Sequence, residues 1–120
     1  MAGWTLFSWQ GFGDGFGQWQ SRCRLCVVPL ERRWIVILDD TGNRGTSITN
    51  CIEHIAPLIA GQFGFAVEDA DWFEFVPKDN RFDRIMLSPR DDVPDVKAYR
   101  PAWRIATKDE DAVLRAVCAG

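Results

Sequence analysis

The fold is decided by three consecutive pieces: WIVIL (34–38), DDTGNRGTS (39–47) and ITNCIEHIAPLIAGQF (48–63). The first is short, rich in β-branched residues and bounded by charge, which predicts a buried strand. The second has two glycines and several small polar side chains, which predict a loop. The third repeats apolar residues at steps of three and four, which predicts a helix with one buried stripe.

The predicted helix has recognisable ends. Thr46 or Ser47 can cap its first amide groups, and Gly61 and Gly64 can end it. Pro57 cannot donate the usual backbone hydrogen bond, so we expect a kink or a new start there. The expected buried stripe consists of Ile48, Cys51, Ile52, Ile55, Leu58, Ile59 and Phe63.

The other strands follow from shorter patterns. Residues 22–28, 71–76, 82–87 and 103–105 predict strands, and the second and third form a hairpin in which Glu74 can face Arg84. Thr107 and Glu110 predict a capping box that opens a terminal helix, with Val113, Leu114 and Val117 facing the core. We therefore predict one α+β domain over residues 1–120, an antiparallel sheet of about four to six strands with two helices packed on one face.

Residues 1–20 form an aromatic and glycine-rich N-terminal segment. The segment holds six aromatic residues separated by four glycines: Trp4, Phe7, Trp9, Phe12, Phe16 and Trp19. One interpretation is a hairpin whose aromatic side chains cap the core. The other is an exposed surface on which Trp9 and Phe12 anchor a protein partner.

Composition and charge exclude several classes of protein. The net charge is −3, and no basic face of the kind that binds a nucleic-acid backbone is evident. No apolar run approaches the roughly 20 residues of a membrane span, and the N-terminus lacks the pattern of a secretory signal. We expect a cytoplasmic protein that binds neither membrane nor nucleic acid.

The four cysteines allow two interpretations. Cys23, Cys26, Cys51 and His54 have spacings typical of zinc ligands. However, Cys51 falls on the helix stripe, and Cys23 and Cys26 would lie on opposite faces of a strand. Buried thiols are the alternative that we favour, so no cofactor is expected.

The loop over residues 39–47 can bind an anion, because free amide groups and the helix dipole meet there. The stretch resembles the phosphoribosyltransferase motif. That resemblance implies that Asp39 and Asp40 hold ribose hydroxyls while Gly45, Thr46 and Ser47 bind a 5′-phosphate. Arg44 stands where that family has Thr, although its guanidinium can neutralise an anion.

A second resemblance covers roughly the second half of the chain. It is carried by Gly45-Thr46-Ser47-x-Thr49-Asn50-x-x-Glu53, Trp72-x-Glu74, Phe82-Asp83 and Pro101-x-Trp103. The pattern is similar to that of a family of small, uncharacterised bacterial proteins carried on mobile elements. The resemblance implies an accessory protein that binds a host or phage protein, without any catalytic residue to carry over.

Two hypotheses follow. The first is a non-enzymatic protein-binding module, such as an anti-CRISPR inhibitor, that uses Trp9, Phe12 and the polar patch Arg44, Thr46, Ser47, Thr49, Asn50 and Glu53. Its partner is a host or phage protein, or a second copy of the chain. The second is a phosphate- or nucleotide-binding enzyme that uses Asp39, Asp40, Gly45, Thr46 and Ser47.

Overall fold

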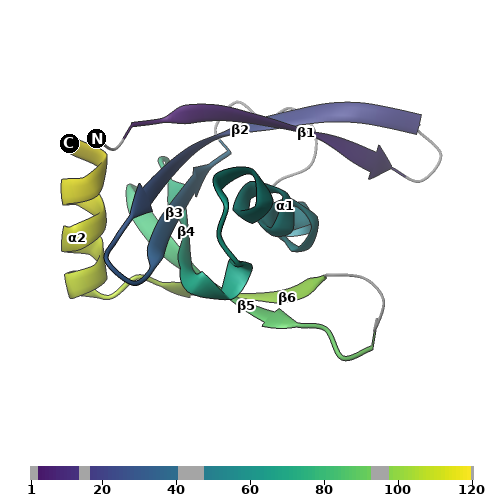
Figure 1. Ribbon diagram of the computed structural model, residues 1–120. Helices are drawn as coiled ribbons and strands as arrows, with labels where there is room; N and C mark the ends of the chain where they lie inside the picture. The colour runs from purple at the N-terminus through teal and green to yellow at the C-terminus, as the bar shows by residue number, and fades with distance from the viewer. Residues whose placement is uncertain (1–2, 14–16, 41–47, 93–97, 120) are drawn as a thin grey trace.

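The described part of the chain forms six strands and two α-helices, shown in Figure 1. The computed structural model describes residues 3–13, 17–40, 48–92 and 98–119, without the side chains of residues 10–13, 17–21 and 48–51. The strands are β1 (Thr5–Gly13), β2 (Gly17–Pro29), β3 (Trp34–Asp39), β4 (Ala70–Val76), β5 (Arg81–Pro89) and β6 (Tyr99–Ile105). The helices are α1 (Ile48–Phe63) and α2 (Lys108–Ala119), with a short 3₁₀ turn, η1 (Val67–Asp69), before β4.

The six strands form one sheet in chain order, from β1 at one edge to β6 at the other. All neighbouring pairs are antiparallel except β3 and β4, which run parallel. A parallel pair needs a long crossover, and α1 provides it. The predicted α+β class and a mostly antiparallel sheet are thus confirmed, with one β–α–β unit at the centre.

The two helices cover opposite faces of the sheet, so the prediction that both pack on one face is wrong. Val36 and Leu38 pack with α1, whereas Ile35 and Ile37 pack with Leu114 of α2. Figure 1 shows α2 on one side of β3 and β4 and α1 on the other. The physical reason is that residues 35–38 are apolar at every position, and such a strand buries both of its faces.

The buried stripe of α1 is largely as predicted. Ile52, Ile55 and Ile59 are completely buried against the sheet, and burial of each such side chain stabilises the fold by roughly 1.5–3 kcal/mol. Leu58 is the exception, because 56% of its surface is exposed. The side chains of Ile48 and Cys51 lie outside the described residues.

The end of α1 is set by Gly64 rather than Gly61. Gly64 has a φ of +83°, and its amide donates to the carbonyl of Ala60 at 2.9 Å. This left-handed conformation ends helices and suits glycine, which has no Cβ. Pro57 lies inside α1, so the helix does not begin again there.

The N-terminal segment forms the predicted hairpin. β1 and β2 pair from Thr5 opposite Leu25 to Gly13 opposite Gly17. Phe7 and Trp9 are buried in the α1-side core, with their rings stacked at 5.8 Å. The first of the two interpretations of this segment, a core-capping hairpin, therefore holds for the described side chains.

The capping box at the start of α2 is confirmed. The Thr107 amide donates to Glu110 Oε1 at 3.0 Å, and the Glu110 amide donates to Thr107 Oγ1 at 3.2 Å. Leu114 and Val117 face the core as expected, but Val113 is exposed.

Candidate functional site

The residues predicted to bind an anion or a partner fall mostly outside the described part of the chain. Arg44, Gly45, Thr46 and Ser47 lie outside the described residues, and so do the side chains of Phe12, Thr49 and Asn50. Glu53 is described: its carboxylate pairs with Arg90 at 3.2 Å. Of the predicted polar patch, Glu53 alone can be placed, and it links α1 to the end of β5.

Trp9 is not an exposed anchor. Only 6% of its surface is accessible, because the side chain packs between the sheet and α1. The prediction that Trp9 contacts a partner directly is therefore wrong for this conformation, since alternation along β1 turns Phe7 and Trp9 inward together.

Asp39 and Asp40, expected to hold one ribose together, have different surroundings. Asp39 ends β3 fully buried and forms an ion pair with Arg24 of β2. Strand alternation places Asp39 on the same face as Ile35 and Ile37, beneath α2. Asp40 is half-buried, and its charge acts on Glu74, on the α1 side. The two carboxylates therefore do not converge on one ligand.

Glu74 is the most unusual ionisable group among the described residues. It lies toward the carboxyl end of β4, opposite Leu38 of β3, and is 8% exposed. Burial raises its pKa to about 7, and the nearby charge of Asp40 adds to this effect. Its carboxylate accepts a hydrogen bond from the Trp103 indole at 3.2 Å, which favours the charged form, while Asp83 directly opposite disfavours it. A carboxyl group that titrates near neutral pH can hold or release a proton.

The expected pair between Glu74 and Arg84 does not form. Arg84 lies opposite Phe73 in the β4–β5 register, with its guanidinium 5.1 Å from the centre of that ring. A shift of one residue in register moves a side chain to the other face of a sheet. Arg84 therefore lies on the α2 side, away from Glu74.

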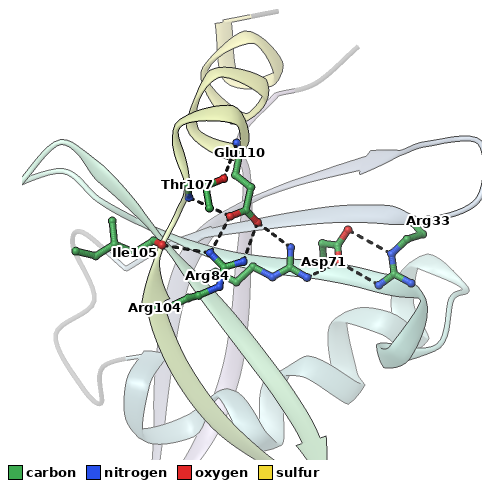
Figure 2. Close-up of polar contacts among 7 residues, drawn as sticks. All are labelled: Arg33, Asp71, Arg84, Arg104, Ile105, Thr107 and Glu110. Atoms are coloured by element: carbon green, nitrogen blue, oxygen red, sulfur yellow. Dashed lines mark hydrogen bonds and ion pairs between the residues drawn. The ribbon is translucent and has the colours of Figure 1, made fainter.

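A chain of ion pairs joins the start of α2 to the sheet, as Figure 2 shows. Arg84 bridges Asp71 at 2.7 Å and Glu110 at 3.1 Å. Arg33 donates to both oxygens of Asp71, and Arg104 donates to both oxygens of Glu110. The network engages three arginines with two carboxylates, so its main effect is to fix α2 against β4 and β5.

The pKa values of both carboxylates in this network are shifted. Hydrogen bonding from Arg104 is the largest influence and lowers the pKa of Glu110 to about 2; burial, the next largest, opposes it, and hydrogen bonds with Thr107 add to the lowering. For Asp71, burial is the largest single influence and raises the pKa, but hydrogen bonds and charge from Arg33 and Arg84 together outweigh it. Both groups are therefore carboxylates at neutral pH and do not exchange protons there.

Two hollows lie beside α2. The first, about 260 Å³, is next to the ion-pair network and is lined by Ile35, Asp71, Phe73, Arg84, Asp109, Glu110, Val113 and Leu114. The second, about 330 Å³, lies at the end of α2 and is lined by Trp4, Phe75, Phe82, Arg115, Cys118 and Ala119. Neither is lined by Asp39, Asp40 or Glu74, so neither matches the predicted anion site.

A zinc site is not assembled from the described residues. Cys23 packs in the core under α1 and Cys26 in the core under α2, so the two thiols lie on opposite faces of β2. His54 is largely exposed on α1, and the side chain of Cys51 is not described. Within residues 3–13, 17–40, 48–92 and 98–119, no three His, Cys, Asp or Glu side chains are placed to hold a metal ion.

The two edges of the sheet differ in chemistry. β1 spans nine residues, TLFSWQGFG, without charge or proline. β6, YRPAWRI, carries Arg100, Pro101 and Arg104. An edge strand presents unpaired backbone groups, and charged residues and proline prevent another strand from pairing with it. Among the described residues, the sheet thus has one protected edge and one open edge.

The fold and these features define a small α+β protein with one open sheet edge and a buried carboxyl group. Comparison with protein-family models, curated proteins and solved structures found no match. Neither helix in the described ranges has the length and apolar character needed to cross a membrane.

Sequence reasoning did not single out the open edge or Glu74. The contrast appears once the strand bounds are known, since β1 lacks charge and proline while β6 contains both; the predicted last strand, 103–105, left Pro101 outside. Nothing in the sequence pattern marks Glu74 as buried, because its environment comes from β5, β6 and the residue after β3.

Proposed function

We propose that this chain is a small non-enzymatic protein-binding module that recognises an extended protein segment through the outer edge of β1. The observation that carries this proposal is the contrast between the two sheet edges. In strand addition, backbone hydrogen bonds provide affinity and alternate side chains provide selectivity. A nine-residue edge strand directs the backbone groups of about every second residue outward, enough for an added strand of ordinary length.

The described side chains of β1 fit this role. Thr5, Leu6 and Ser8 are exposed, and Leu6 retains 60% of its surface. Phe7 and Trp9 point into the core and fix the strand from the other face. An exposed apolar residue beside small hydroxyl side chains favours a partner segment that is itself uncharged and β-forming.

Most strong ionic interactions in the described part of the chain maintain the fold. Arg24 and Arg84 each bind a carboxylate from another strand, and Arg33, between β2 and β3, binds Asp71 of β4. Arginines and carboxylates that are paired with each other hold the strands and helices in place and are not available to act on a substrate. This supports a binding role over a catalytic one.

The biological setting of this proposal is a bacterial mobile element. The resemblance to small bacterial mobile-element proteins supports an accessory or inhibitory role, with a host or phage protein as the partner. An anti-CRISPR inhibitor is one form that such a role takes. Within the described part of the chain, the thiols of Cys26 and Cys118 form no disulfide, which supports a reducing compartment such as the cytoplasm.

The test compares capture of partners by two surface variants. Immobilised wild-type protein, Ser8→Lys and Ala102→Lys are each exposed to a bacterial lysate, and bound proteins are quantified. Ser8 and Ala102 are both exposed, on β1 and β6 respectively, so the variants differ in the edge that becomes charged. We expect Ser8→Lys to lose a specific partner at least tenfold and Ala102→Lys to retain it. Equal capture by all three proteins contradicts the proposal.

A second candidate is the phosphate- or nucleotide-binding enzyme. The observation that favours it is Glu74, whose pKa of about 7 suits proton transfer and which lies at the carboxyl ends of the parallel strands β3 and β4. The charge there disfavours an anion, because Asp40 and Asp83 are close to Glu74. A thermal-shift titration with phosphate, nucleotides and phosphoribosyl compounds tests it, and no stabilisation by any of them counts against this candidate.

A further inference from the structure

We infer that a second copy of this chain occupies the open edge of β1, as a two-fold antiparallel pair that joins two six-stranded sheets into one. The inference rests on the proposed function in one respect, namely that the β1 edge is an interaction surface. It goes beyond that function because it states what pairs with the β1 edge when no other protein is bound, namely a second copy of the chain.

A strand can pair with its own copy only if no like charges meet near the centre of the pair. In a two-fold antiparallel pair, the central residue faces its own copy, and every other residue faces the one equally far beyond the centre in the partner copy. Any charge near the centre therefore lies close to an identical charge. A pair centred on Ser8 places Ser8 opposite Ser8 and Leu6 opposite Gln10 of the partner copy. No Asp, Glu, Lys or Arg occurs between Thr5 and Gly13, so this arrangement brings no like charges together.

The opposite edge fails the same condition. A two-fold pair centred on Ala102 of β6 places Arg100 opposite Arg104, and like charges directly opposite are destabilising. Pro101 also lacks the amide hydrogen that a strand ladder needs. The two edges therefore predict a closed dimer through β1 rather than an open chain of sheets.

The exposed surface of β1 supports a strand-shaped occupant. Leu6 is 60% exposed, one of the most exposed large apolar side chains among the described residues, and lies on the edge strand itself. A neighbouring strand covers part of such a side chain, which recovers hydrophobic stabilisation. The same edge serves a partner segment, so self-association and partner binding are mutually exclusive.

The test combines a charge swap with a measurement of oligomeric state. Sedimentation velocity and light scattering follow wild type, Ser8→Lys, Ser8→Asp, their equimolar mixture and Ala102→Lys from about 1 μM to about 1 mM. We expect concentration-dependent dimers for wild type and Ala102→Lys, and dimerisation weakened at least tenfold in each Ser8 variant alone. The mixture regains dimers, because Lys and Asp attract across the pair. Matching thermal melts of the Ser8 variants show that they are folded.

Each outcome has a defined meaning. Wild type that stays monomeric, Ser8→Lys that dimerises like wild type, or a mixture that does not regain dimers overturns the inference. Monomeric wild type together with loss of a lysate partner in Ser8→Lys overturns this inference and leaves the proposed function standing. A Ser8-dependent dimer whose capture of lysate proteins is unchanged by Ser8→Lys supports this inference and contradicts the proposed function.

Discussion

Trp103 donates its indole N–H to the carboxylate of Glu74 at 3.2 Å, from β6 to β4 across the intervening strand β5. Among the described residues, this contact is the only hydrogen bond to the Glu74 carboxyl group. The residue directly opposite Glu74 on β5 is another acid, Asp83. One neutral donor does not compensate for burial and for the charge of Asp40, so the pKa of Glu74 rises to about 7. The native protein therefore binds a proton here that the unfolded chain has released.

The first prediction concerns this proton. Between the ordinary glutamate pKa of 4.5 and about 7, the native state binds more protons than the unfolded state, so stability falls as pH rises through this window. Glu74→Gln cannot ionise. We expect its free energy of unfolding to match wild type near pH 4.5 and to exceed wild type by up to about 3 kcal/mol above pH 7. Urea unfolding at a series of pH values measures the difference, and a difference independent of pH contradicts the prediction.

A second prediction concerns the start of α2. The pKa of Glu110 is lowered from 4.5 to about 2, chiefly by its hydrogen bonds with Arg104. Its contribution to stability is therefore present above pH 4.5 and is lost as pH falls toward 2. Glu110→Gln should remove this part of the acid sensitivity, as measured by denaturation at pH 2–5.

A third prediction concerns Thr107, the capping residue that forms hydrogen bonds with Glu110. Thr107→Ala removes the side-chain oxygen that accepts the Glu110 amide, so we expect a loss of about 1 kcal/mol at neutral pH. Lys108→Ala at the neighbouring exposed position is the control and should change stability by less than about 0.5 kcal/mol. Equal effects of the two substitutions would show that the cap does not stabilise α2.

The fourth prediction separates two residues of the α1 pattern. Ile55 is completely buried and Leu58 is mostly exposed, although both fit the same helical spacing. We expect Ile55→Ala to cost about 2–5 kcal/mol, because it opens a cavity under the sheet. Leu58→Ala should cost less than about 0.5 kcal/mol, as is usual for surface positions. Thermal or urea denaturation measures both, and a large effect at Leu58 would indicate that another chain covers it.

Local patterns predicted the elements of this fold better than their arrangement. The stripe of Ile52, Ile55 and Ile59 and the Thr107–Glu110 box depend on spacings within one helix, and both are found. The face covered by α2 depends instead on the chain as a whole. The unbroken apolar run of β3 was the available indication that both faces of the sheet are buried.

Cross-strand relationships were harder still to predict. Phe73 faces Arg84 and Glu74 faces Asp83, one residue away from the register that pairs Glu74 with Arg84. The turn between β4 and β5 decides this register, and Asn80 within it has a φ of 51°, which sequence alone does not reveal. The predicted register was one residue away from the observed one, so it placed Arg84 on the wrong face of the sheet. The prediction therefore missed both the ion pairs of Arg84 with α2 and the absence of a basic residue opposite Glu74.

The last prediction concerns Trp9, which sequence reasoning offered as a candidate partner contact. Its side chain is buried beside Phe7, so Trp9→Ala should cost about 3–5 kcal/mol and loosen the β1–β2 hairpin. A loss of partner binding in that variant would then reflect damage to the edge rather than loss of a direct contact.

Within the described part of the chain, the buried indole nitrogen of Trp9 has no hydrogen-bond acceptor. Trp9→Phe removes this polar group but keeps an aromatic ring, so it should cost at least about 2 kcal/mol less than Trp9→Ala. Equilibrium unfolding of the two variants, followed by sedimentation of Trp9→Phe, checks this: the Phe variant should retain both the fold and the association of wild type. If Trp9→Phe instead destabilises the protein as much as Trp9→Ala, the indole N–H has a stabilising partner.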